Sequence, residues 1–129
     1  MSMDGLYRDY ILDHYKNPRN FGELDPHDLD AHDHNPLCGD DMGVHVRLDA
    51  DGRIAEIAFH GQGCAISQAA ASIASDEYIG MRPDEVPALS ADWMIEQLGI
   101  DISPTRRKCA LLNLKVMRGA TSERADWPE

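Results

Sequence analysis

The sequence is short of basic residues and has no long apolar run. Its 129 residues include 12 Lys or Arg against 23 Asp or Glu, for a formal net charge of -11. A chain this acidic lacks the basic footprint that binds phosphates, which argues against a nucleic-acid partner. No apolar stretch approaches the roughly 20 residues that cross a bilayer, and the N-terminus lacks the features of a secretion signal. We therefore expect one small cytoplasmic domain with no membrane partner.

Cysteine is also scarce, and its count is odd. The chain has three cysteines, Cys38, Cys64 and Cys109, so internal disulfides cannot use all of them. Thiols stay reduced in the cytoplasm, where grouped cysteines more often bind metal or react. The three are too far apart in sequence for a CxxC pair, so only the fold can bring them together.

Two stretches with alternating apolar residues predict a β-hairpin. The turn between them falls at Asp51-Gly52, a pair typical of tight hairpin turns. Before the hairpin we expect a helix that ends ahead of Pro18, and then a long loop over residues 19–41, rich in Pro, Gly, Asn and Asp. The alternating apolar residues are Val44, Val46 and Leu48, then Ala55, Ile57 and Phe59.

Helical periodicity dominates the second half of the chain. An alanine-rich helix should follow Cys64 and end at Gly80, and a short one should run from an N-cap at Ser90 to Gly99. We expect the last helix to open at Ser103 and Pro104. The fold class is then α+β, a small antiparallel sheet of about three strands with helices packed on it, in one domain over residues 1–120. Residues 121–129 should form a frayed tail.

The motif RRKC concentrates positive charge beside a thiol. Arg106, Arg107 and Lys108 directly precede Cys109 near the start of the last helix, and Cys64 precedes another helix. Helix N-termini and neighbouring cations favour a thiolate over a thiol. The cationic run therefore favours an anionic sulfur species on Cys109.

Simpler interpretations of these residues stay open from sequence alone. Cys109 can be a small buried apolar residue, the cationic run a solvated helix face, and Asp40 a turn residue. Gly61 and Gly63 can simply end a strand. Four histidines could bind metal, but two fit ordinary strand positions and two lie in the acidic loop: His45 and His60, and His32 and His34.

Four motifs together resemble one known family. They are LDHYKNPRNFG, NPLCGDD, GQGCAIS and RRKCALL, and the resemblance runs from Leu6 to Ala120. The chain resembles the SufU/IscU (NifU N-terminal-like) iron–sulfur cluster assembly scaffolds. The resemblance implies that Cys38, Asp40, Cys64 and Cys109 converge on one site for zinc or a [2Fe–2S] cluster, with Cys109 as the sulfur acceptor. Three thiolates and one carboxylate suit both occupants.

The resemblance also implies a function and partners. Such a scaffold accepts sulfur from a PLP-dependent cysteine desulfurase, binds iron or zinc, and passes a cluster to apo acceptor or carrier proteins. Two alternatives remain: a zinc-dependent sulfurtransferase that relays persulfide sulfur, and a structural zinc-binding domain. The residues fit a scaffold and sulfur acceptor better than a turnover enzyme.

The chain departs from both branches of the family. Lys108 stands where IscU-type members have a histidine, which makes it a SufU-like residue that should tune Cys109 rather than bind metal. The segment between Cys64 and Cys109 is short, as in the IscU type. The leucine–proline–proline–valine–lysine element that engages a chaperone is absent. Tyr7 matches a position implicated in self-association, so a weak homo-oligomer and a core role for Tyr7 both stay open.

Overall fold

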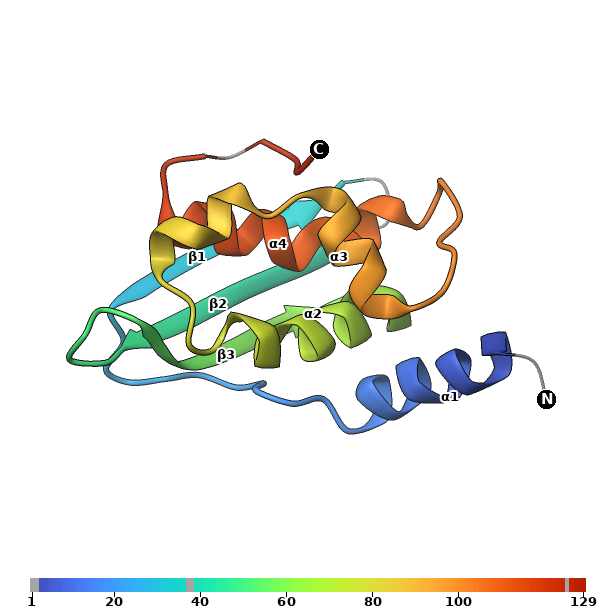
Figure 1. Cartoon of the computed structure of the whole chain (residues 1–129), viewed down its shortest axis with the longest axis horizontal. Helices are drawn as coiled ribbons and strands as arrows, with labels where there is room; N and C mark the ends of the chain where they lie inside the picture. The colour runs from blue at the N-terminus through green and yellow to red at the C-terminus, as the bar shows by residue number, and fades with distance from the viewer. Residues whose placement is uncertain (1–2, 37–38, 125) are drawn as a thin grey trace.

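The computed structural model describes residues 3–36, 39–124 and 126–129, with side chains from residue 8 onward. Figure 1 shows a three-stranded sheet covered by helices, with α1 lying to one side. In chain order the elements are α1 (Met3–Lys16), β1 (Leu29–Asn35), β2 (Asp40–Leu48), β3 (Ile54–Gln62), α2 (Ala65–Tyr78), the 3₁₀ helix η1 (Pro83–Ala88), α3 (Ala91–Leu98) and α4 (Arg107–Thr121). Among these helices, none is both long and apolar enough to cross a membrane.

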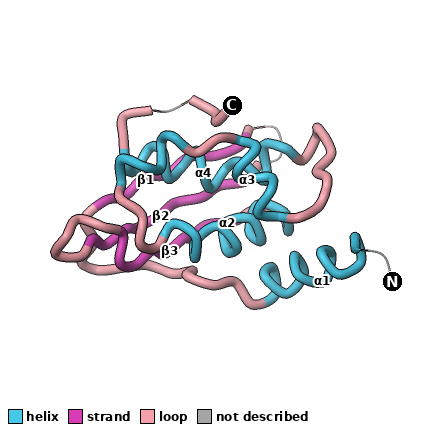
Figure 2. The backbone as a smooth tube through the Cα atoms, in the orientation of Figure 1, coloured by secondary structure: helices cyan, strands magenta, loops and turns pink. Residues whose placement is uncertain are grey.

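The sheet is antiparallel throughout, in the order β1-β2-β3. The predicted hairpin forms β2 and β3, with Val44 opposite Phe59 and Val46 opposite Ile57, and these four side chains are buried. Helix α4 packs on β1 and β2, while α2 packs on β3 and on α4 (Figures 1 and 2). The α+β class with about three strands is therefore confirmed.

Strand β1 corrects our expectation of a loop over residues 19–41. Its half-buried residues Leu29, Ala31 and Asp33 alternate with exposed ones, and Asp33 forms an ion pair with Lys115 of α4. This edge strand has one strongly apolar residue, so its period-two pattern is hard to recognise in the sequence. What holds it is main-chain pairing with β2 and contact with α4.

Of the two helix starts predicted from an N-cap serine, the one at Ser90 was right and the one at Ser103 was wrong. Ser90 caps α3 by accepting a hydrogen bond from the Trp93 N–H at 3.0 Å, and Gly99 ends α3 at a φ of 73°, as expected. Helix α4 begins at Arg107 rather than at Ser103. The Ser103 carbonyl accepts from the Arg106 N–H at 2.9 Å in a separate turn. Cys109 consequently lies in the first turn of α4.

Residues 126–129, the last part of the segment that we expected to fray, contact the helices. Trp127 packs against the core, and the Ala91 N–H at the start of α3 donates to the main-chain oxygen of Glu129 at 2.9 Å. The ammonium groups of Lys108 and Lys115 lie over the Trp127 ring, 5.2 and 5.0 Å from its centroid. These contacts hold the segment along α4.

Candidate metal centre

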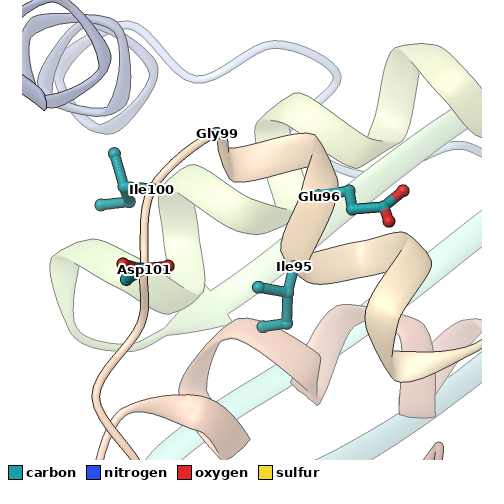
Figure 3. Close-up of a pocket in the computed structure, with 5 residues that line it drawn as sticks. All are labelled: Ile95, Glu96, Gly99, Ile100 and Asp101. Carbon is teal, nitrogen blue, oxygen red and sulfur yellow. The ribbon is translucent and has the colours of Figure 1, made fainter. Parts of the chain in front are cut away.

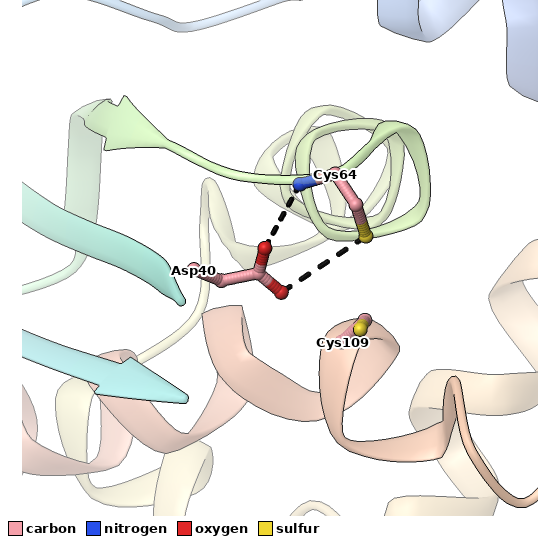
Figure 4. Close-up of side chains that lie close together, drawn as sticks. All are labelled: Asp40, Cys64 and Cys109. Carbon is pink, nitrogen blue, oxygen red and sulfur yellow. Dashed lines mark hydrogen bonds between the residues drawn. The ribbon is translucent and has the colours of Figure 1, made fainter. Parts of the chain in front are cut away.

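Asp40 opens β2 and directs its carboxylate toward the start of α2. Its side chain is buried, and Oδ1 accepts a hydrogen bond from the Cys64 N–H at 2.9 Å. Its other oxygen, Oδ2, lies 3.9 Å from the Cys64 Sγ (Figure 4). One residue therefore positions Cys64 through the main chain and also presents an oxygen beside its sulfur.

Gly63 lets these groups approach each other. A Cβ at this position would lie 2.2 Å from the Ser67 Oγ and 3.2 Å from the Asp40 Oδ1, so a side chain would displace one of them. Ser67 is itself fixed, because its hydroxyl donates to the Cys64 carbonyl at 3.0 Å. From the sequence alone, Gly63 could be interpreted as a residue that ends a strand. In the structure it packs closely against Asp40 and Ser67.

Cys64 is the N-cap residue of α2 and has extended backbone angles of φ -69° and ψ 170°. At this place the positive end of the helix dipole favours an anionic sulfur. Cys64 is half-buried and lines a cavity of about 500 Å³ together with Asp40, Gly63 and Gln68. An incoming group in this cavity can therefore reach the Cys64 sulfur.

Cys109 is fully buried in the first turn of α4. The buried amide of Asn35, at the end of β1, places its Nδ2 3.9 Å from the Cys109 Sγ, within the longer reach of a hydrogen bond to sulfur. In Figure 4 the Cys109 sulfur faces the gap between Asp40 and Cys64. Its position follows from the packing of α4 on β1 and β2.

The ligand atoms of Asp40, Cys64 and Cys109 all lie within 4.8 Å of one another. Cys38, the fourth residue of the predicted site, lies outside the described residues. Two thiols and a carboxylate at this spacing fit the donor set that zinc and cluster irons accept. No other group of three His, Cys, Asp or Glu side chains in the described ranges could hold a metal ion.

Arg106 is the cation of the RRKC motif that faces the thiols. The pKa of its guanidinium is raised, first by a hydrogen bond with Cys64 and then by the charges of Cys64 and Cys109. Arg107 instead lies 3.9 Å from the Asp92 carboxylate, and Lys108 lies over Trp127. The sequence grouped these three cations, and the structure separates them by the direction of their side chains.

The histidines lie apart from this centre. His27 and His45 stack with centroids 3.9 Å apart, and His60 meets His45 edge-on at 4.8 Å. His32, exposed on β1, pairs with Asp41. Within the described part of the chain, none of these rings joins Asp40 and the two thiols.

A second hollow, beside Gly99, has a different character. It measures about 370 Å³ and is lined by Ile95, Glu96, Gly99, Ile100 and Asp101. Figure 3 shows Ile100 and Asp101 on the loop after α3, with the Glu96 carboxylate directed away from them. With two dispersed carboxylates and no thiol, this hollow offers no comparable reactive group.

The fold and the thiol–carboxylate group define a class: a small α+β protein with a candidate metal centre between a sheet end and two helix N-termini. Residues 6–125 match the model of the NifU-like N-terminal domain, and the chain belongs to that family. The resemblance inferred from the four cysteine-centred and N-terminal motifs is thereby confirmed.

Named relatives fall in both branches of the family. The chain is 35% identical to the zinc-dependent sulfurtransferase SufU of Bacillus subtilis, over 95% of this chain and 94% of that protein. It is 29% identical to the iron–sulfur cluster assembly scaffold protein IscU of Azotobacter vinelandii, over 91% and 92% of the two chains.

Solved structures support the fold. A crystal structure of a hypothetical protein has 31% identity and a TM-score of 0.78, with 95% of this chain and 100% of that chain covered. A SUF-system scaffold from Fervidobacterium islandicum has the same TM-score at 23% identity, with 94% and 100% covered. The second similarity concerns the fold alone.

Proposed function

We propose that the protein is an iron–sulfur cluster assembly scaffold that accepts sulfur from a PLP-dependent cysteine desulfurase. In this proposal Cys38, Asp40, Cys64 and Cys109 hold iron or zinc, and the assembled cluster passes to apo acceptor proteins. The observation that carries the proposal is the convergence of Asp40, Cys64 and Cys109 within 4.8 Å, from three separate elements. Membership of the NifU-like N-terminal family supports it. The domain boundary at residue 120 stays a prediction.

Sulfur acceptance needs an anionic sulfur nucleophile on this chain. The Cys109 thiolate attacks the outer sulfur of the desulfurase persulfide. A new S–S bond forms to Cys109, the S–S bond on the desulfurase breaks, and the desulfurase cysteine leaves as a thiolate. The Arg106 guanidinium stabilises negative charge on both described thiols, which supports the persulfide product as well as the attacking thiolate.

The residues present fit a metal ion. The three thiols and Asp40 would hold it, and zinc bound there would keep the thiols deprotonated. Asp40 accepts the Cys64 N–H with one oxygen, which leaves its other oxygen directed toward the sulfurs. A carboxylate is a harder ligand than a thiolate, so we propose that Asp40 makes cluster binding labile, as release to an acceptor requires.

A zinc-dependent sulfurtransferase is the second candidate. It is favoured by the 35% identity to the Bacillus subtilis protein of that name. In this version an acceptor thiolate attacks the outer sulfur of the Cys109 persulfide, the S–S bond to Cys109 breaks, Cys109 leaves as a thiolate, and no cluster is assembled. A purely structural zinc domain fits less well, because Cys64 lines an open cavity and Arg106 neutralises charge at the thiols.

Anaerobic reconstitution separates these functions. The protein is incubated with a cysteine desulfurase, cysteine and ferrous iron, and then with an apo acceptor. A scaffold develops cluster absorbance and transfers it. A sulfurtransferase becomes persulfidated in its zinc form without building a cluster. A structural domain does neither, and that result would remove the proposed function.

A further inference from the structure

A third cavity, lined by polar and charged side chains, lies near the C-terminal end of α4, away from the thiols. It measures about 230 Å³ and is lined by residues from the end of η1, the start of α3, α4 and the C-terminal segment, among them Ser90, Arg118, Arg124 and Glu129. Arg118 is nine residues beyond Cys109 on the same helix, which separates the two by about 13 Å along its axis. The cavity is therefore distinct from the metal centre.

Arg118 is the unusual residue of this cavity. It is only 3% exposed, and its Nε and Nη1 atoms have no hydrogen-bond partner among the described residues. An arginine side chain keeps its charge when buried, and unpaired buried N–H groups are costly. The two unpaired N–H groups of Arg118 need hydrogen-bond acceptors, and the oxygens of a bound anion can supply them.

The acidic neighbours do not satisfy Arg118. Asp126 lies 3.7 Å from its Nη2, beyond hydrogen-bond distance, and is 55% exposed. The same carboxylate accepts from Arg124 at 3.1 and 3.3 Å, and the Arg124 hydrogen bond is the main cause of the lowered pKa of Asp126. Glu129 lines the cavity but forms no ion pair with either guanidinium within the described part of the chain. The Asp126 carboxylate is therefore shared by Arg118 and Arg124.

The N-terminal end of α3 forms another part of the cavity wall. Ser90 is the N-cap residue of α3, and the Ala91 N–H donates to the main-chain oxygen of Glu129. An oxygen acceptor already occupies this helix end, as its dipole favours. The cavity therefore combines two guanidinium groups with the positive end of a helix, in a chain whose overall charge is -11.

We infer that this cavity binds a small dianionic oxyanion of the phosphate type, through Arg118 and Arg124. Phosphate matches the guanidinium groups in charge and in acceptor number, and it fits the available volume. The anion supplies acceptors to a buried cation that Asp126 reaches only at long range.

Titration calorimetry with inorganic phosphate tests the inference. The purified full-length chain is titrated at fixed ionic strength, with chloride as the reference salt, because nonspecific charge effects must be held constant. We expect saturable binding in the millimolar range or tighter. Arg124→Gln should weaken it about tenfold, the factor expected for one charge-assisted hydrogen bond. Glu129→Gln should strengthen it, because it removes a negative charge from the lining.

Matched variants make the outcome decisive. Arg118→Gln should abolish binding, with its fold checked by circular dichroism; if it fails to fold, the exposed Arg124 variant carries the test alone. Arg8→Gln, the same charge change on an exposed residue of α1, should bind phosphate like the parent. Absence of saturable phosphate binding, or equal binding by the parent and Arg124→Gln, overturns the site. Acetate binding as tightly as phosphate overturns the assignment to a dianion.

Discussion

Cys64 and Cys109 both lie at the N-terminal end of a helix and both face Asp40, yet they differ in accessibility and in support. Cys64 is half-buried, lines the 500 Å³ cavity, and is held through its main chain by Asp40 and Ser67. Cys109 is fully buried, and among the described residues the side chains of Asn35 and Arg106 interact with its sulfur.

The difference lies in what each helix does for the fold. Helix α4 is a core element against β1 and β2, so the position of Cys109 is set by packing. Cys64 belongs to the turn between β3 and α2, and its position is set by hydrogen bonds that a ligand can perturb. We infer that Cys64 is the more adaptable metal ligand, and that Cys109 must become exposed when the desulfurase docks before it can accept sulfur.

The largest expected effect comes from removing the protected thiol. Cys109→Ser should abolish sulfur acceptance from a desulfurase, because an alcohol is not a competent nucleophile toward a persulfide at neutral pH. Cys64→Ser, the matched variant, should retain measurable acceptance. Transfer of radiolabelled sulfur from cysteine, followed on the gel-separated proteins, measures both. Full acceptance by Cys109→Ser would assign the acceptor role to another cysteine.

Gly63→Ala should disturb the Cys64 side of the centre. The new methyl group would lie 2.2 Å from the Ser67 Oγ, so we expect a loss of about 1–3 kcal/mol of stability, as for an overpacked core. Zinc affinity should fall as well, since the new methyl group also crowds the Asp40 Oδ1 at 3.2 Å.

Gly119→Ala is the matched control for that change. A Cβ on Gly119, in α4, would meet the Ala31 Cβ at an ordinary 3.6 Å. Replacing a helical glycine by alanine should raise stability by up to about 1 kcal/mol. Urea denaturation and zinc titration of both variants check the pair; equal stability changes would show that the close approach at Gly63 is not needed.

Alkylation rates sharpen the comparison without mutating the centre. In metal-free protein, iodoacetamide should modify Cys64 about tenfold faster than Cys109, because access as well as thiolate character governs cysteine reactivity. Peptide mass mapping after timed quenching gives each rate. Equal rates would mean that Cys109 becomes exposed on the timescale of the reaction.

Arg106 and Lys108 test which cation supports the sulfurs. Arg106→Gln should slow sulfur acceptance by about fivefold at most, because this cation beside the thiols is exposed and screened by water. Lys108→Gln should change the rate less, because its ammonium lies over Trp127. The tuning role of Lys108 stays a prediction, and we expect Arg106 to have the larger effect. A slower Lys108 variant with an unchanged Arg106 variant would assign that role to Lys108 instead.

How much of this was predictable depended on the range of the interactions. The hairpin and α3 follow local rules, so the sequence was enough to predict both. The hairpin shows alternating apolar residues, and α3 is capped by Ser90 at its start and by Gly99 at its end. Strand β1 depends on tertiary contacts, and its Asp and His residues do not form a recognisable strand pattern in the sequence. The gathering of Asp40, Cys64 and Cys109 came only from the family resemblance. The separate directions of Arg106 and Lys108 depend on the turn before α4, which sequence placed wrongly.

The smallest expected effect concerns Asp40, whose carboxylate lies close to both Cys64 and Cys109. As a hard ligand it should weaken cluster retention, so Asp40→Ala should lengthen the lifetime of a reconstituted cluster about threefold, for a barrier change near 0.7 kcal/mol. The same change removes the acceptor of the Cys64 N–H, so protein stability should fall. Asp40→Asn separates the two roles, because its amide oxygen can still accept that hydrogen bond while its negative charge is gone.

Cluster absorbance is followed after addition of an apo acceptor, beside urea denaturation of each variant. If both variants lose cluster faster than the parent, Asp40 anchors the cluster, and the lability must come from Cys64.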